Sequence, residues 1–322
     1  MSAHVPLTPA DRRRRLRRAA AELADTQHGL LSRRQLKELG ISRWQVRAEI
    51  QASRWRSHGR HSVAVHTRAL EGAARWWWAV FETAGDAMIT ASTALAAAGL
   101  TGYEDDEIHV AVLKSRHHHR PKGVVVHETR RLFPEDRIDL GLPRTPVPMA
   151  TVLAALWART DRQACLLVLM AINQRLVSVQ QLRESTARVR RDKRRRLLLW
   201  VVLAASDGVR AMGELDFAVL CRRRRLPEPD RQVIRYGRNG RVYLDVYWDQ
   251  WRVVVEIEGV EHFEPLAAVH DALRQNKIAI EDGVVLRIPV VGLRTQPGDF
   301  MDQVEAALRE AGCPLPGRAA AA

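Results

Sequence analysis

The stretch that decides the fold of the C-terminal part is Val242-Tyr-Leu-Asp-Val-Tyr-Trp-Asp-Gln-Trp-Arg-Val-Val-Val-Glu-Ile-Glu-Gly259. Its first half alternates between two faces, with Val242, Leu244, Val246 and Trp248 on one and Tyr243, Asp245 and Tyr247 on the other. Alternation of this kind is typical of a half-buried strand. The second half, Trp251 to Glu258, is a run rich in valine that is typical of a buried strand. Together they predict a β-hairpin.

The hairpin carries three carboxylates on one face. If Asp249-Gln250 is a two-residue turn, Asp245 lies opposite Val254, and Glu256 lies diagonally across from Asp245 on the same face. Glu258 falls on that face too. Burying bare charge at the end of an apolar sheet is costly, and a hard divalent cation such as Mg²⁺ compensates it. The alternative is that the acids lie on a solvated strand edge or pair with arginines.

Helices and strands are expected on both sides of the hairpin. The apolar spacing predicts helices at Ala205–Arg225, which contains Glu214, at Ala267–Glu281 and at Asp299–Ala311. A strand is expected after the break at Leu226-Pro-Glu-Pro, and another at Val284–Val291. The predicted order is therefore helix, strand, hairpin, helix, strand and helix.

This region, roughly Val209 to Ala311, resembles the DUF559 family, whose domains are similar in fold to very-short-patch-repair endonucleases of the PD-(D/E)XK group. The matching pieces are Glu214, Arg225-Leu-Pro-Glu-Pro-Asp-Arg-Gln232, Tyr243-Leu-Asp245, Val254-Val-Glu-Ile-Glu-Gly259, His262, Asp271-Ala-Leu-Arg-Gln-Asn276 and Asp282-Gly-Val-Val-Leu-Arg287. Glu258 stands where the nuclease group commonly has a lysine, so the general base stays unassigned. The resemblance implies a C-terminal α/β sheet like that of restriction endonucleases.

The chemistry that this resemblance implies is metal-assisted hydrolysis of a phosphodiester bond. Asp245 and Glu256 would hold Mg²⁺ or Mn²⁺, with the backbone carbonyl of Ile257 as a further ligand. Glu214 or Glu258 would anchor a second metal or orient the water. A loop histidine, His262, is a candidate proton carrier near neutral pH, although such a residue is more often only solvated. Arg274 and Lys277 are candidates for contacting the scissile phosphate.

The N-terminal part carries a second pattern. A helix is expected over Leu16–Thr26, a second from its cap Ser32 to Gly40, and a third from its cap Ser42 to Ile50. The short turn Leu39-Gly-Ile-Ser42 fits a helix-turn-helix. Ser53 to Val65 then predicts a wing of two short strands around Gly59.

In a helix-turn-helix the second helix enters the major groove, and neighbouring cations contact the backbone of the DNA. The polar residues that we expect to contact DNA are Ser42, Arg43, Gln45 and Arg47 on that helix and Arg54, Arg56 and Arg60 on the wing. Trp44 is expected in the core rather than at DNA. The alternative is a small helical module that binds another protein.

This part is similar to the N-terminal winged-helix domain of AbiEi-type antitoxins, DNA-binding regulators of type IV toxin–antitoxin systems. The similarity rests on Gly29-Leu-Leu-Ser-Arg-Arg-Gln-Leu, Gly40-Ile-Ser-Arg-Trp-Gln-Val and Ser53-Arg-Trp-Arg, and more loosely on Ile89-Thr-Ala-Ser, Ile108-His-Val-Ala-Val112, Val124-Val-Val-His-Glu-Thr-Arg130, Gly141-Leu-Pro-Arg-Thr145 and Ala150-Thr-Val-Leu-Ala154. The similarity implies a DNA-binding transcriptional regulator, with a toxin as a candidate protein partner.

The middle of the chain is expected to be mixed α/β. Strands are predicted near Ile108–Leu113 and Val124–Glu128, with helices at Ala69–Thr83, Ala150–Ala158, Arg162–Asn173 and Arg195–Ala205. The basic run Ala187–Arg196 fits either an exposed hinge or a helix that follows phosphates. The predicted domains are a winged helix at 1–68, the mixed region at 69–204, the endonuclease-like domain at 205–313 and a disordered tail at 314–322.

Composition bounds the partner and the compartment. The 322 residues hold 51 Lys and Arg against 37 Asp and Glu, a formal charge of +14, which favours a polyanion as partner. Three scattered cysteines fit a reducing cytoplasm. No apolar run is long enough to cross a bilayer, and the basic start Arg12–Arg18 lacks the apolar core of a signal peptide. Together with the two resemblances, these observations lead us to expect a cytoplasmic DNA-binding protein with a metal-dependent nuclease domain, or a non-catalytic regulator that uses an inactive nuclease fold.

Overall fold

The computed structural model of the chain is a multidomain α/β structure that divides into two units, Met1–Ala150 and Thr151–Ala322. It describes residues 8–83, 85–113, 118–130, 132, 134–207, 213–236, 242–258, 269, 271–276 and 285–315. The expected boundaries near residues 68 and 204 fall inside these units. The predicted tail at 314–322 lies outside the described residues from 316 onward.

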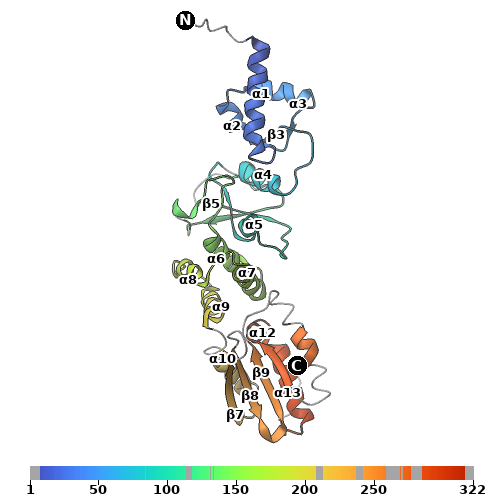
Figure 1. Ribbon diagram of the computed structural model, residues 1–322, viewed down its shortest axis with the longest axis vertical. Helices are drawn as coiled ribbons and strands as arrows, with labels where there is room; N and C mark the ends of the chain where they lie inside the picture. The colour runs from blue at the N-terminus through green and yellow to red at the C-terminus, as the bar shows by residue number, and fades with distance from the viewer. Residues whose placement is uncertain are drawn as a thin grey trace. The chain divides into compact units, whose positions relative to one another are not determined.

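The first unit opens with three helices and a small sheet (Figure 1). The elements are α1 (Pro9–Asp25), β1 (Leu30–Ser32), α2 (Arg33–Glu38), α3 (Arg43–Gln51), β2 (Arg56–Ser57) and β3 (Ser62–Ala64). The sheet order is β1-β3-β2, with antiparallel neighbours. Its core joins buried residues of α1, α2, α3, the sheet and the segments between them, namely Ala20, Ala24, Leu31, Leu36, Ile41, Val46, Trp55 and Val63.

Two capping boxes set where α2 and α3 begin. Ser32 and Gln35 bond reciprocally at the start of α2, and Ser42 and Gln45 do the same at the start of α3. Gly40, with a φ of +82°, makes the turn between the helices. The predicted caps and the two short strands around Gly59 are thus confirmed. Strand β1, however, was not expected, and α1 begins at Pro9 rather than Leu16.

The second sheet of this unit follows α4 (Ala73–Thr83). Its strands are β4 (Met88–Ile89), β5 (Ile108–Leu113) and β6 (Val124–Thr129), in the order β4-β5-β6, with α5 (Ala91–Ala97) between β4 and β5 and a 3₁₀ turn, η1 (Pro134–Asp136), after β6. Strands β5 and β6 run parallel, and both were predicted. Helix α4 also packs on the first sheet, because Trp77 lies in one cluster with Leu30 and Ala64.

Helices fill the beginning of the second unit. They are α6 (Val147–Trp157), which begins just before the unit boundary, α7 (Asp161–Asn173), α8 (Val179–Ala187) and α9 (Arg195–Asp207). The basic run between α8 and α9 is not uniformly exposed. Arg194 is buried, and its guanidinium donates to the carboxylate of Asp161 at 3.0 Å and to the carbonyl of Leu156 at 3.2 Å. At least this arginine ties the helices together.

The second unit ends in a four-stranded sheet. Its elements are α10 (Gly213–Arg223), β7 (Arg231–Tyr236), β8 (Val242–Trp248), η4 (Asp249–Trp251), β9 (Val253–Glu258), β10 (Val285–Pro289), α12 (Val290–Thr295) and α13 (Pro297–Glu310). The order is β10-β9-β8-β7, with β10 parallel to β9 and the other pairs antiparallel. The structure describes residues 269 and 271–276 of the predicted helix Ala267–Glu281, and these are helical. The other predicted elements occur in the predicted order, with two differences. Pro289 ends β10, and α12 replaces the last predicted strand residues. The single predicted helix over 205–225 is divided between α9 and α10.

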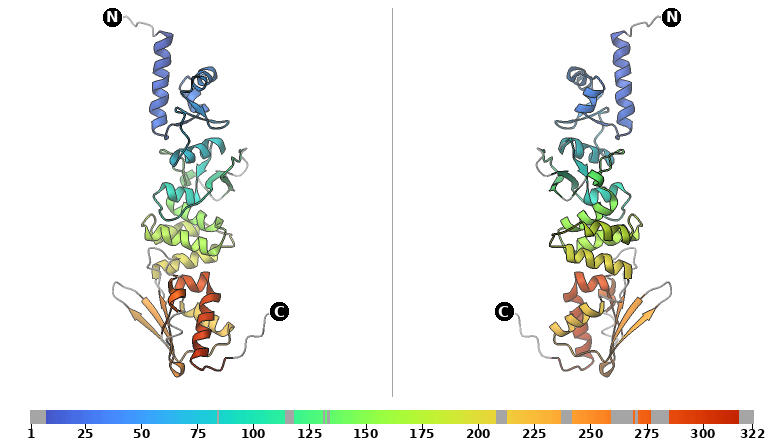
Figure 2. Two further views of the ribbon diagram at one scale, coloured as in Figure 1. Left: turned by 90° about the vertical axis from the view of Figure 1, so that its right-hand side faces the viewer. Right: turned by 90° about the vertical axis from the view of Figure 1, so that its left-hand side faces the viewer.

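One face of this sheet is apolar and covered by helices (Figure 2). Trp248 is fully buried, meets Phe217 of α10 edge to face at 6.2 Å, and donates its indole N–H to the carbonyl of Pro227 at 3.0 Å. The other inward side chains include Val246, Val255, Ile257, Leu286 and Ile288. Because side chains alternate along strands, this packing turns Glu256 to the opposite face.

Candidate functional site

Asp245 and Glu256 lie directly opposite each other on adjacent strands. The predicted register, with Asp245 opposite Val254, was wrong by two residues. The chain turns through the 3₁₀ segment η4 and the left-handed residue Arg252 instead of a two-residue turn, so Trp248 pairs with Val253. A shift of two residues keeps every side chain on its predicted face. The two acids are therefore closer in register than predicted, since directly opposed Cβ atoms are roughly 5 Å apart.

Glu256 is also next to a cation. In the parallel pairing of β9 with β10 it stands opposite Arg287, and Arg287 Nε lies 3.4 Å from Glu256 Oε2. Arg287 is exposed, whereas Glu256 is only partly so. The row Asp245–Glu256–Arg287 thus crosses three strands, β8, β9 and β10. Carboxylate oxygens are the donors that Mg²⁺ or Mn²⁺ prefers, and this donor set fits such an ion.

The remaining predicted members of this site are distributed around the sheet. Glu258 stands opposite Tyr243, and Glu214 is the second residue of α10. Ile257 is buried in a central strand with its side chain on the apolar face. Arg274 is exposed and pairs with Asp271 at 3.2 Å. His262 and Lys277 lie outside the described residues.

Within the described part of the chain, no group of three His, Cys, Asp or Glu side chains is placed to hold a metal. The side chains of Asp245, Glu214 and Glu258 lie outside the described part of the structure. The metal site at this sheet therefore stays a prediction, with Glu256 as its described member.

Helix α3 turns a basic face with one aromatic residue to solvent. Arg43 and Arg47 are exposed, and in the described residues no carboxylate pairs with either of them. Trp44 is 62% exposed, and the guanidinium of Arg43 lies 4.8 Å from its ring centroid. The expectation that Trp44 belongs to the core was wrong, because Val46 and Ile50 occupy the inward positions of this helix.

Two other candidates on α3 have a structural role. The Ser42 hydroxyl accepts from the Gln45 N–H at 3.3 Å, and the Gln45 side-chain oxygen accepts from the Ser42 N–H at 2.8 Å. These bonds satisfy N–H groups that the first turn of a helix leaves open. Arg43, Trp44 and Arg47 therefore face outward without such a role, as do the uncharged Ala48 and Gln51.

Glu49 is a buried acid between two arginines. Arg17 Nε lies 2.7 Å from Glu49 Oε1, and Arg54 Nε lies 2.5 Å from Glu49 Oε2. Burial raises the pKa of Glu49, but the hydrogen bonds and charges of Arg54 and Arg17 outweigh it, and the net pKa is lowered. The two ion pairs link α1, α3 and the residues before β2. Arg54, a predicted DNA contact, is engaged here.

Glu82 of α4 contacts the tip of the β2–β3 hairpin, which is the predicted wing. Glu82 is 3% exposed, and its carboxylate accepts from the N–H groups of Arg60 at 2.9 Å and His61 at 2.7 Å and from the Ser62 hydroxyl. A Cβ at Gly59 would lie 2.6 Å from this carboxylate, so the tip fits closely against it. The backbone of the wing is fixed while the Arg60 side chain stays exposed.

The structure adds one residue to the predicted basic face. Arg33, the first residue of α2, donates from Nε to the Arg60 carbonyl at 3.1 Å and from Nη2 to the Ser57 hydroxyl at 3.0 Å. Arg56 donates to the carbonyl of Thr67 at 3.2 Å. The sequence signal for Arg33 was its place directly after the cap Ser32, but only the fold brings it to the wing.

A polar cluster on the second sheet was not predicted either. His109 Nδ1 and His127 Nε2 lie 2.8 Å apart, and His109 Nε2 lies 3.1 Å from Asp105 Oδ2, which also accepts from the Ser92 hydroxyl at 2.8 Å. Burial, followed by the charge of His109, lowers the pKa of His127 to about 3. His127 is therefore neutral at physiological pH.

Comparison with known proteins gave no support for either resemblance: no family model matches the chain, and no curated protein matches it. In the ranges that the structure describes, there is no helix of the length and apolar character needed to cross a membrane.

Proposed function

We propose that this chain binds DNA through α3 and the β2–β3 hairpin. The observation that carries the proposal is the outward face of α3, where Arg43, Trp44 and Arg47 are exposed while Val46 and Ile50 pack on α1 and the sheet. The order of helices and strands from α1 to β3 is that of a winged helix, in which the third helix enters the major groove.

Charge supports the same reading. The chain carries a formal charge of +14, and the cations near α3 and the wing are exposed. Arg33 and Arg60 flank the wing tip, whose backbone α4 holds in place. Such cations attract phosphates irrespective of sequence, whereas side chains on the helix read base edges.

The test is a measurement of duplex DNA affinity at several NaCl concentrations. We expect Arg43→Ala/Arg47→Ala to weaken binding by at least about tenfold and to lower the slope of log K against log[salt] by about 1 for each lost phosphate contact. Arg75→Ala/Arg130→Ala removes the same charge from exposed positions outside α1–β3 and serves as the control. Equal affinity of the two double variants, or binding that does not depend on salt, would overturn the proposal.

We propose, second, that the four-stranded sheet hydrolyses DNA with a divalent metal. The specific observation is the row Asp245–Glu256–Arg287, which places two acids opposite each other and an arginine beside them. Asp245 and Glu256, with the Ile257 carbonyl, would hold the ion, and Glu214 or Glu258 would orient water or hold a second ion. The metal would acidify a bound water and stabilise the charge that develops on the phosphate.

Cleavage of supercoiled, linear and single-stranded DNA tests this activity, with Mg²⁺ or Mn²⁺ and with chelator. Glu256→Gln should abolish metal-dependent cleavage, whereas Glu228→Gln, at an exposed acid before β7, should not. If the wild-type chain cuts none of these substrates, or if Glu256→Gln cuts them equally well, the nuclease proposal fails. The chain would then be a DNA-binding regulator, antitoxin-like in its first part, that uses an inactive nuclease fold.

A further inference from the structure

The first turns of α1 project without packing against anything in the described residues. The inward residues of α1 are Leu16, Ala20, Leu23 and Ala24, which join the core of the first sheet. All residues from Pro9 to Arg15 are exposed. At 1.5 Å per residue this segment is about 10 Å long. In Figure 2 it rises clear of α2 and α3. We call residues 9–15 the arm.

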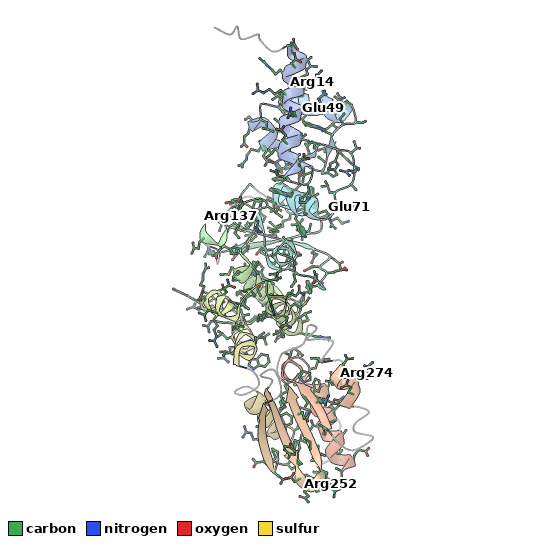
Figure 3. The ribbon with its side chains drawn as sticks, viewed as in Figure 1. Arg14, Glu49, Glu71, Arg137, Arg252 and Arg274 are labelled. Carbon is green, nitrogen blue, oxygen red and sulfur yellow. The ribbon has the colours of Figure 1, made fainter. Side chains whose placement is uncertain are left out.

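Arginines surround the arm. Arg12, Arg13, Arg14 and Arg15 are consecutive, and successive residues of an α-helix are about 100° apart, so the four side chains point to every side of the helix. Figure 3 shows Arg14 on this segment. A helix that only needs to cover a core would present one polar face. This arm presents cations in all directions.

The charge of the arm opposes the stability of its own helix. The N-terminal end of a helix carries a partial positive charge, so cations there are unfavourable, and adjacent arginines repel one another. The acid of the first turn is Asp11, which caps the helix together with Thr8: the Asp11 N–H donates to the Thr8 hydroxyl at 3.1 Å, and that hydroxyl donates to Asp11 Oδ2 at 2.6 Å. A charge pattern that works against local stability points to a binding role.

The base of the arm, where it joins Leu16, lies next to the start of α3. A Cβ placed on Gly40, in the turn between α2 and α3, would lie 4.0 Å from Leu16 Cδ2, so Leu16 lies against that turn. Arg17, one residue further, is held by Glu49 of α3. The base of the arm therefore lies beside the turn that leads into Arg43 and Trp44. Apolar contacts of Leu16 and the ion pair of Arg17 fix it there.

We propose that the arm is a second DNA contact, which binds backbone phosphates next to the bases that α3 faces. This inference rests on the DNA binding proposed above. Guanidinium groups bind phosphate oxygens through two N–H donors, and they bind alike on every sequence. The arm thus adds affinity and salt dependence without adding sequence preference.

The experiment compares Arg13→Ala/Arg14→Ala with wild type in the full chain, on a duplex that carries a preferred site and on a random duplex. Alanine favours helix, so α1 is preserved, and circular dichroism with thermal unfolding verifies this. We expect a salt slope smaller by about 1 to 2, and the same fold loss of affinity on both duplexes. Arg75→Ala/Arg130→Ala is the control of equal charge.

Two results would overturn the inference, and they differ. If the wild-type chain binds DNA but the arm variant keeps the salt slope and affinity of the control, the arm is not a contact and the role of α3 is untouched. If the wild-type chain shows no salt-dependent DNA binding, the proposed function fails and the arm fails with it. If the arm variant does lose affinity, replacing all four residues 12–15 by lysine separates the effect of charge from that of the guanidinium shape. Retained affinity assigns the contact to charge, and lost affinity assigns it to the paired N–H donors of arginine.

Discussion

The segment from α1 to β3 and the sheet β7–β10 use charge in opposite ways. In the first, the acids Glu49 and Glu82 (the latter supplied by α4) are buried behind the surface, and arginines face outward. In the second, Glu256 is partly exposed and lies opposite Asp245 on the neighbouring strand. A surface with cations in front suits a polyanion, and one with paired carboxylates in front suits a cation. The function of a charged residue therefore depends on the groups it contacts, and its burial or exposure alone does not indicate that function.

The buried acid Glu82 gives the largest expected effect. Glu82→Ala leaves two backbone N–H groups and the Ser62 hydroxyl at the wing tip without their acceptor, which should lower the free energy of unfolding by about 3 kcal/mol. Urea denaturation measures it. Glu71→Ala, at an exposed acid before α4 (Figure 3), should change the stability by less than about 0.5 kcal/mol. Similar stabilities of the two variants would show that Glu82 does not organise the wing.

The acids Asp245 and Glu256 on the sheet should respond to metal instead. Mn²⁺ at about 100 times its Kd should stabilise the wild-type chain by about 2.7 kcal/mol, because an ion that binds only the folded state shifts the unfolding equilibrium. Glu256→Gln should remove this gain, and Arg287→Met should enlarge it, since Arg287 Nε lies 3.4 Å from Glu256 Oε2. Thermal unfolding with and without metal provides the measurement. Equal stabilisation of wild type and Glu256→Gln would place the ion elsewhere.

Acid should distinguish the two units, because His127 lies in the first. Burial and the charge of His109 lower the pKa of His127 to about 3, below its ordinary value of 6.5. The unfolded chain then binds more protons between these values, so the stability that is present above pH 6.5 is lost as the pH falls. The slope is at most about 1.4 kcal/mol per pH unit, or about 2 kcal/mol by pH 5.

His127→Gln should flatten this part of the curve, which denaturation at a series of pH values would reveal. His119→Gln is the matched control. If the slope between pH 6.5 and 5 is unchanged in His127→Gln, the neutral state of His127 contributes nothing to the stability of the first unit.

Trp44 gives the smallest effect, on binding rather than stability. Because this side chain is 62% exposed, Trp44→Ala should leave the free energy of unfolding within about 0.5 kcal/mol of wild type. DNA affinity should fall by about 1 kcal/mol, or roughly fivefold, if the indole contacts DNA beside Arg43. Leu140→Ala, at a residue that is 86% exposed, is the control for loss of exposed apolar surface. An unchanged affinity of Trp44→Ala would remove Trp44 from the interface.

Patterns with a fixed period were predictable from sequence. The faces of β8 and β9 follow from alternation, and the starts of α2 and α3 follow from Ser32 and Ser42, whose reciprocal bonds are local. The register between β8 and β9 was missed because it depends on the backbone path through Asp249–Arg252, where Arg252 adopts a left-handed conformation. A period-two pattern cannot distinguish registers that differ by two residues.

Features that depend on contacts distant in sequence were not predictable. Trp44 was expected in the core because tryptophan is usually buried, but the interior positions of α3 are already filled by Val46 and Ile50. The bonds of Glu82 to the wing join residues some twenty positions apart, and those of Arg33 to Arg60 span 27 positions. Nothing in the local pattern of either residue indicates its partner.

The backbone of the edge strand β10 is protected against pairing with a strand of another copy of this chain. Asn276 donates its side-chain N–H to the Arg287 carbonyl at 2.8 Å and accepts from the Arg287 N–H at 2.7 Å, and Gln303 contacts the same amide at 3.1 Å. One side chain thus occupies both backbone groups that an incoming strand would use. Addition of a strand at this point would first have to displace the amide, so Asn276 protects the edge of the sheet against the pairing that leads to aggregation.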